Sequence, residues 1–523
     1  MKVLAILPAF SQIEEQQLTF SRRDFLKSST ATVATAVSPL ALTSASASPR
    51  VVDEFIDYDA LGMADLIKTR EISAREAVEI TIRRIEAMEP IINVMNTRSY
   101  ERAYDRAEAI AADTTFAGVP ILIKDMIDVG GVRRTDGSRM LMTNIPAENV
   151  MYIDGVEAAG MNIVGMTNVP EFAQLGVITN NTAFGLSRNP WDLSLSTLGS
   201  SGGSGAAVAA GIVPMAHGTD GGGSNRLPAS VQGIFGMKPS RARMLPGEVG
   251  GQHGPVKTNQ VLSRTVRDSA ALFAHTEDPN GPFAPVGVIS GPSSRRLRIG
   301  FAPAIKGGIA VEAPVAKAQE NTAQLLRDLG HQVSEAEIPI SHDEFFQHYN
   351  GAFLGQFGVF NDQAMAISGS PAAASGLLDP FTASLIAYGA ETPDDVAAAG
   401  MAYLAKVPAA YAELFAGIDV LLSPVMPFLS VKGDALTPQT LVNDSVLDFL
   451  QHGLSYTASA NVSGHCAMSV PLNWDPVSGL PIGSMFQAAT GNDGLLYQLA
   501  FELEEARPWK DRWAPYSVKH IPI

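Results

Sequence analysis

The sequence of 523 residues contains a single cysteine, so it cannot form an internal disulfide, a cysteine-based zinc site or an Fe–S cluster. Charged residues are also scarce: they make up 17% of the chain, compared with about 25% in an average soluble domain. Because a long chain hides a larger share of its surface, this balance indicates a large apolar interior. The formal net charge is −16, and an acidic chain is poorly suited to bind phosphate backbones. We therefore expect no nucleic-acid partner.

Long apolar runs are missing as well, since no stretch of about 18 consecutive apolar residues occurs. We therefore expect no stable membrane association. The N-terminal segment has the features of an export signal instead: paired arginines at 22–23, a mildly apolar stretch over 28–42 and an Ala-x-Ala site at 45–47. We interpret residues 1–47 as a twin-arginine signal, which predicts contact with the twin-arginine export machinery and a periplasmic or secreted protein. The alternative is an ordinary amphipathic start with a chance arginine pair.

Strand and helix patterns alternate along the rest of the chain, which predicts an α/β layer architecture. Ser73 and Glu76 form a capping box, and the helix that follows should end at Pro90. A Gly/Pro/Ser-rich stretch at 279–294 predicts a linker or surface loop. Short apolar runs predict strands at 119–123, 161–166, 212–216, 297–301, 418–422 and 468–472, and further helices are expected at 100–112, 205–210, 311–329 and 494–506.

Lys124 directly follows the apolar run at 119–123. Its neighbours favour burial, and burial disfavours the charged form of a lysine amine. An uncharged amine can act as a general base. The alternative is a lysine at a strand end that extends its charged group into solvent.

Two segments rich in glycine and serine lie further along the chain, at 199–204 and 221–224. Gly221, Gly222 and Gly223 allow consecutive backbone N–H groups to converge on one small volume, as a developing oxyanion requires. Ser224 closes this run and is placed to attack a carbonyl carbon. The alternatives are a turn before a helix or an anion-binding loop, although the Gly-Lys-Ser/Thr of a phosphate loop is absent.

The segment 199–203 also fits the G-x-S-x-G nucleophile elbow, with Ser201 as the nucleophile. That motif requires a strand immediately before it and a histidine later in the chain. The preceding segment, 191–197, is rich in Ser and Asp and is a poor strand candidate, and His465 is the one late histidine we would nominate. This interpretation is therefore disfavoured.

Taken together, these segments resemble the amidase signature family over nearly all of the chain after the signal. The resemblance is carried by Lys124, the serines and glycines of 199–224, and further segments of matching sequence at 61–67, 118–125, 165–172, 187–191, 233–239, 469–472, 479–483 and 503–509. It implies one amidase domain over 51–520, built as α/β/α layers in which helices cover both faces of a large, twisted, mixed sheet.

The resemblance also implies a Ser-cisSer-Lys triad. Ser224 would be the nucleophile, Ser200, preceded by a cis peptide bond, the bridging residue, and Lys124 the base. The backbone N–H groups of Gly221, Gly222, Gly223 and Ser224 would form the oxyanion hole. No cofactor or metal is implied, and the nine histidines show no metal-ligand spacing.

The activity that follows is hydrolysis of a small-molecule amide, which we expect to be a neutral aryl, aliphatic or cyclic amide. The alternatives are the glutaminase subunit of a tRNA-dependent amidotransferase and an exported binding protein without activity. The segment 344–380, rich in Phe and Gly, is the candidate for a pocket wall or lid.

Three residues depart from the family pattern. Leu198 replaces a usual glycine before Gly199, which reduces the backbone freedom at the entry to Ser200. Asn225 replaces an apolar residue after Ser224, and Cys466 occupies a position where proline is common. We expect Cys466 to be a small core residue, with a place in the acyl pocket as the alternative.

Overall fold

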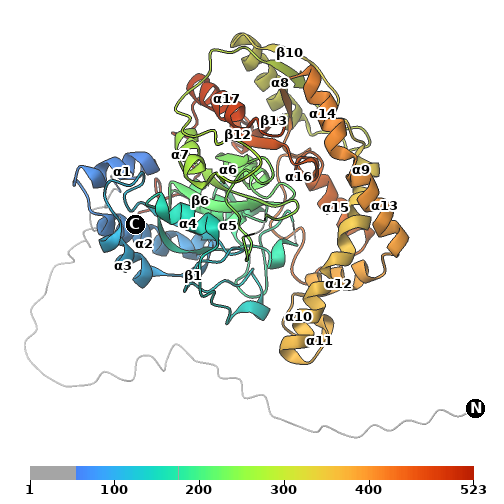
Figure 1. The fold of residues 1–523 in the computed structure, drawn as a ribbon, viewed down its shortest axis with the longest axis horizontal. Coiled ribbons are helices and arrows are strands. Elements are labelled where there is room, and N and C mark those ends of the chain that lie inside the picture. Colours follow the sequence, from blue (N-terminus) through green and yellow to red (C-terminus); the bar gives the residue numbers. More distant parts are fainter. Residues whose placement is uncertain (1–52, 54, 175, 252, 523) are drawn as a thin grey trace, which may run out of the picture. The chain divides into compact units, whose positions relative to one another are not determined.

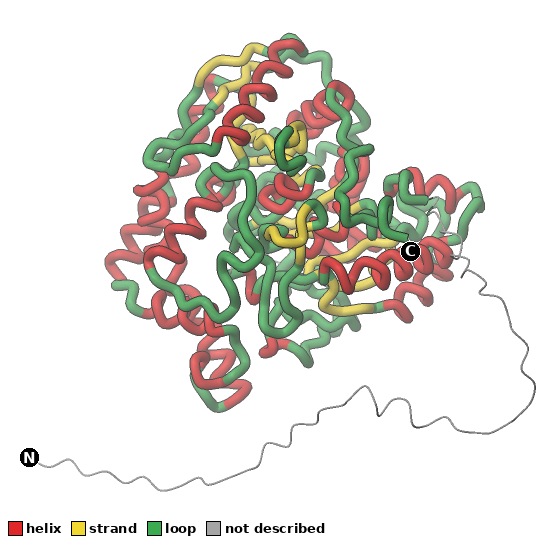
Figure 2. The backbone as a smooth tube through the Cα atoms, turned by 180° about the vertical axis from the view of Figure 1, so that it is seen from behind, coloured by secondary structure: helices red, strands yellow, loops and turns green. Residues whose placement is uncertain are grey.

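An 11-stranded mixed sheet forms the centre of the fold, and helices pack on both of its faces (Figures 1 and 2). The structure is a computed structural model that describes residues 53, 55–174, 176–251 and 253–522. The predicted signal at 1–47 lies outside these residues. The strands follow the order β1 (Met95–Arg98), β3 (Asn162–Thr167), β2 (Pro120–Lys124), β6 (Met215–Asp220), β8 (Thr258–Ser263), β7 (Phe235–Lys238), β12 (Cys466–Trp474), β13 (Pro481–Ala488), β11 (Val420–Pro424), β9 (Arg298–Phe301) and β10 (Gln332–Glu335). The predicted α/β class with a large mixed sheet is confirmed.

The helices fill the connections between these strands. They are α1 (Ala60–Lys68), α2 (Ala74–Ile92), α3 (Tyr100–Ala109), α4 (Met151–Ala158), α5 (Gly202–Ala209), α6 (Arg226–Gln232), α7 (Val266–Thr276), α8 (Ala313–Asp328), α9 (His342–Phe353), α10 (Gly358–Ser368), α11 (Ala372–Ser375), α12 (Pro380–Ala390), α13 (Asp394–Leu404), α14 (Val407–Gly417), α15 (Asp444–Leu454), α16 (Ala458–Ser463) and α17 (Asp493–Ala506). Among the described residues, no helix has both the length and the apolar character needed to cross a membrane.

Most predicted elements coincide with observed ones, and two differ. The capping box of Ser73 and Glu76 begins α2, but the helix passes Pro90 and ends at Asn93, which adopts a left-handed conformation. Buried Ile92 continues the apolar face beyond the proline. The strand expected at 212–216 is instead β6, which extends to Asp220 because its polar side chains are buried in the interior.

The parallel pairing of β2 with β3 and β6 positions the candidate site. Leu122 in β2 pairs with Ala216 in β6, so both strands run in the same direction. Because parallel strands end at the same edge of a sheet, Lys124 at the end of β2 lies beside Thr219 near the end of β6. The topology thus joins positions that are about 95 residues apart in sequence.

Helix α5 follows the first Gly/Ser segment and packs very closely against the end of β3. A Cβ atom added to Gly203 would lie 2.5 Å from the backbone oxygen of Asn168 and 2.7 Å from its nitrogen. The Gly203 N–H also donates to that oxygen, at 3.2 Å. Glycine is therefore required here by close backbone approach.

We expect Gly203→Ala to lower the free energy of unfolding by about 1–3 kcal/mol, because α5 must move away from Asn168. Urea denaturation measures the effect. Gly417→Ala is the matched control, since Gly417 in α14 has open space around its missing side chain. Equal stability of the two variants would contradict the proposed close packing.

Candidate active site

Lys124 ends β2 and is completely buried. Its Nζ lies 2.7 Å from Ser200 Oγ, 2.7 Å from Thr219 Oγ1 and 3.3 Å from the backbone oxygen of Thr219. Burial holds the pKa of Lys124 well below its ordinary value of 10.5, and the positive charge of Lys257 lowers it further. Asp220 and Asp136 act in the opposite direction and are outweighed.

These three contacts match the bonding capacity of an uncharged amine. Its two N–H bonds can donate to the two oxygens of Thr219, which leaves the nitrogen lone pair directed at the Ser200 hydroxyl. Thr219 carries no motif of its own, and sequence reasoning missed it.

The chain approaches Ser200 through a strained turn. The Gly199–Ser200 peptide bond is cis, as the family resemblance implied. Leu198 is buried and has φ of 53°, a left-handed conformation that glycine adopts more readily. Three side-chain hydrogen bonds hold it: its N–H donates to Ser196 Oγ at 2.9 Å, and its carbonyl oxygen accepts from Thr179 Oγ1 at 2.8 Å and from Thr197 Oγ1 at 3.0 Å.

The glycine run 221–223 forms a loop between β6 and α6, and Ser224 follows it. The N–H of Gly223 donates to Asp220 Oδ1 at 2.8 Å, so it does not face the cavity, contrary to the expectation that all four N–H groups would do so. In the described part of the chain, the N–H groups of Gly221, Gly222 and Ser224 have no hydrogen-bond partner. Three donors thus remain available for an oxyanion.

A buried ion pair between Arg226 and Asp220 holds this loop in place. Arg226 makes two hydrogen bonds of 2.9 Å to the carboxylate of Asp220, and Asn461 Nδ2 donates to the same carboxylate at 3.0 Å. Burial alone would raise the pKa of Asp220, but Arg226, Lys238 and Asn461 together outweigh that effect and lower it far below its usual range. Asp220 is therefore a fixed anion that orients Gly223. Sequence reasoning singled out neither member of this pair.

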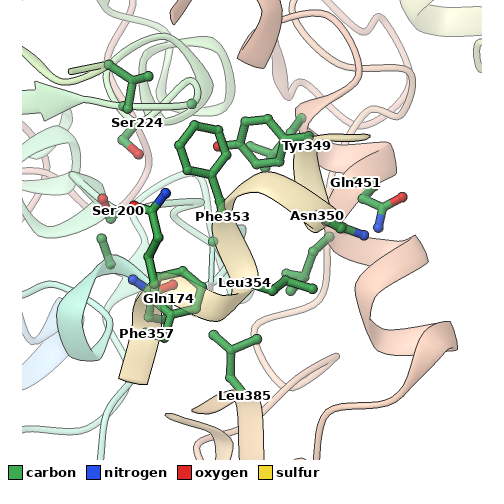
Figure 3. A pocket seen from close by; sticks show the side chains of 18 of the residues that line it. Gln174, Ser200, Ser224, Tyr349, Asn350, Phe353, Leu354, Phe357, Leu385 and Gln451 are labelled. Carbon is green, nitrogen blue, oxygen red and sulfur yellow. The ribbon is translucent and has the colours of Figure 1, made fainter. Parts of the chain in front are cut away.

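Ser200 and Ser224 line the same cavity and lie on the same side of it (Figure 3). No hydrogen bond joins their hydroxyl groups within the residues that the structure describes. Catalytic hydrogen bonds are commonly long before substrate binds and shorten in the substrate complex.

The cavity has a volume of about 320 Å³ and mostly apolar walls. Helix α9 and the segment that follows it supply Phe346, Tyr349, Phe353 and Phe357, so the expectation that 344–380 would line a pocket is confirmed. Sequence reasoning missed the rest of this apolar wall, to which α12 and α15 contribute the side chains Leu385, Leu447, Leu450, Gln451 and Leu454. Lys257 is the one charged residue among the described residues of the lining.

The nucleophile-elbow interpretation is wrong. Ser201 is buried, and its hydroxyl lies 3.2 Å from Asn225 Oδ1. His465 instead lies against Gln487 Oε1, at 2.8 Å. The preceding segment does form a strand, β5 (Asp192–Ser196), but it pairs with β4 (Arg188–Asn189) in a separate two-stranded sheet.

The other two departures from the family pattern are also accommodated. The Asn225 amide is fully used, since it accepts from Ser201 and donates to the carbonyl oxygens of Met237 and Gln260. Cys466 lies in the core, within β12, and does not line the cavity.

Comparisons with known proteins agree with this geometry. The sequence profile of the family described as Amidase matches residues 76–497. The chain is 34% identical to the putative amidase AmiC of Mycobacterium leprae, covering 87% of this chain and 97% of the relative. It is 32% identical to the 6-aminohexanoate-cyclic-dimer hydrolase of Paenarthrobacter ureafaciens, covering 87% and 96%.

Two solved structures extend the likeness to the fold. A 6-aminohexanoate cyclic dimer hydrolase complexed with its substrate superposes with a TM-score of 0.79 at 29% identity, covering 89% of this chain and all of the other. A bacterial aryl acylamidase superposes with a TM-score of 0.77 at 25% identity, covering 88% and 98%. The chain therefore belongs to the amidase family and is an amide hydrolase of the amidase signature type.

Proposed function

We propose that this amidase works through an acyl-enzyme on Ser224, formed by a relay of Ser224, Ser200 and Lys124. The observation that carries the proposal is the buried Lys124 amine, which lies 2.7 Å from Ser200 Oγ, while Ser200 and Ser224 line one cavity.

In the proposed mechanism, uncharged Lys124 takes the proton of Ser200 while Ser200 takes the proton of Ser224. Ser224 Oγ then bonds to the amide carbon, and the resulting oxyanion is stabilised by the N–H groups of Gly221, Gly222 and Ser224. The proton returns through Ser200 to the leaving nitrogen as the C–N bond breaks. Water cleaves the ester by the same relay.

We infer that the substrate is a neutral aryl, aliphatic or cyclic amide, because the walls of the cavity are mostly apolar and aromatic. The two structural relatives are named for a cyclic amide and for aryl amides. A glutaminase role is disfavoured, because glutamine carries both an ammonium and a carboxylate group whereas the described lining offers one charged side chain. Comparing the turnover of anilides, fatty amides and the 6-aminohexanoate cyclic dimer would show which class of amide the enzyme hydrolyses.

Removing the proposed nucleophile should abolish amide turnover, so Ser224→Ala is expected to be inactive. Lys124→Ala should lower kcat/KM by roughly 10³-fold or more while the fold is retained. Initial rates on the best substrate of the panel, with circular dichroism for the fold, measure both effects. Unchanged rates in either folded variant would overturn the assigned roles.

Covalent labelling identifies the reacting serine directly. A fluorophosphonate should add its phosphonyl mass to the peptide that contains Ser224. Ser201→Ala is the matched control and should still be labelled, because the Ser201 hydroxyl is engaged with Asn225. Absence of label on the folded wild-type protein would favour a binding protein over an enzyme.

The charge of Lys257 provides a test through pH. It pairs with Glu248 at 2.5 Å and lowers the pKa of Lys124. Activity requires the uncharged base, so kcat/KM should rise with pH through the pKa of Lys124. Lys257→Met removes a positive charge that lowers the pKa of Lys124. The pKa of Lys124, and with it the acidic limb of the kcat/KM profile, should therefore move to higher pH.

Lys317→Met is the control for that shift, since Lys317 is an exposed residue paired with Glu320 on α8 and lies outside the cavity lining. The pH profile of this variant should match the wild type. If the acidic limb of Lys257→Met stays in place or moves to lower pH, the assignment of Lys124 as the base is contradicted.

We also propose export through the twin-arginine route, on the strength of the signal pattern at 1–47. Replacing both Arg22 and Arg23 with lysine should retain the precursor in the cytoplasm of a bacterial host, as cell fractionation would show. Arg50→Lys, outside the signal, is the control and should not alter export. Export of the double variant at the wild-type level would argue against this route.

A further inference from the structure

Tyr349 lies on α9 and extends into the cavity opposite the two serines (Figure 3). Three aromatic neighbours fix its ring: Phe353 at 4.7 Å between ring centroids, Phe345 at 5.7 Å and Phe346 at 5.8 Å. Its hydroxyl has no hydrogen-bond partner in the part of the chain that the structure describes. Tyr349 is half-buried, so this hydroxyl is open to the cavity and available to a ligand.

The hydroxyl lies beside the oxyanion loop. A Cβ atom added to Gly222 would be 3.9 Å from Tyr349 Oη. The free N–H groups of Gly221 and Gly222 and the phenol thus border the same part of the cavity, next to Ser224.

The phenol is also in the correct protonation state to donate. Burial, assisted by the nearby anion of Asp220, raises the pKa of Tyr349 to about 12. It therefore keeps its proton at neutral pH, and it can stabilise negative charge on an adjacent oxygen without transferring that proton.

We propose that the Tyr349 hydroxyl donates a hydrogen bond to the oxygen of the scissile carbonyl, together with the N–H groups of Gly221 and Gly222. This inference rests on the proposed acyl-enzyme mechanism. It makes Tyr349 a catalytic residue supplied by the pocket wall, and it compensates for the N–H of Gly223, which is committed to Asp220. Because charge builds up on that oxygen in the transition state, the bond should contribute more to kcat than to substrate binding.

Tyr349→Phe tests the inference, because it retains the aromatic packing and removes only a hydroxyl that has no described protein partner. The fold should survive, which circular dichroism and thermal melting would show. We expect kcat to fall by a factor on the order of 10², the usual effect of losing one oxyanion donor, with KM nearly unchanged. Wild-type kcat, or a loss confined to KM, would overturn the inference.

A second measurement uses a boronic acid, which forms a tetrahedral adduct with a serine nucleophile. Its affinity for Tyr349→Phe should fall by a similar factor, and equal affinity for the two proteins would contradict the donor role. Tyr403→Phe is the control: it also removes a tyrosine hydroxyl, but Tyr403 lies on α13 outside the cavity lining, so kcat and KM should match the wild type. The inference fails separately from the proposed function, since an active wild-type enzyme with an equally active Tyr349→Phe variant rejects the inference alone.

Discussion

The site depends on one interaction, the contact of a buried lysine amine with the Ser200 hydroxyl. Lys124 is fully enclosed, so its charged form is disfavoured, and the two oxygens of Thr219 occupy its donors. The lone pair that remains is directed at Ser200. The parallel pairing of β2 and β6 creates this arrangement, because it places the ends of both strands at the same edge of the sheet. In the proposed mechanism, burial keeps the amine uncharged, so Lys124 takes the place of the histidine base of other hydrolases.

The oxyanion loop is organised by a second buried group, the carboxylate of Asp220. Arg226 and Asn461 hold this carboxylate, and Asp220 in turn fixes the N–H of Gly223. Nearly all the polar atoms around the loop are therefore set before substrate binds, which is how preorganised sites stabilise developing charge. The walls are mostly apolar, because helices α9, α12 and α15 supply mainly apolar side chains, and the proposed donor Tyr349 comes from one of these walls.

The sequence predicted the groups that form local patterns and missed those that depend on distant contacts. Lys124 follows an apolar run and Ser224 closes a glycine run, so both could be identified from their neighbours, whereas Ser200 was identified through the family resemblance. Thr219 and Asp220 could not be identified, because polar residues in a buried strand look like loop residues until their partners are known. The contribution of α15 to the cavity could not be predicted either, because this helix lies more than 200 residues after Ser224 in the sequence.

The protonation state of Lys124 is the central claim, and NMR can observe it directly. In protein labelled with ¹³C at lysine Cε, the resonance that is absent from Lys124→Met belongs to Lys124, and its chemical shift can be followed against pH. The midpoint should lie well below the ordinary value of 10.5. A midpoint at that ordinary value would mean that the amine is charged at neutral pH, and it would contradict the role of Lys124 as the base.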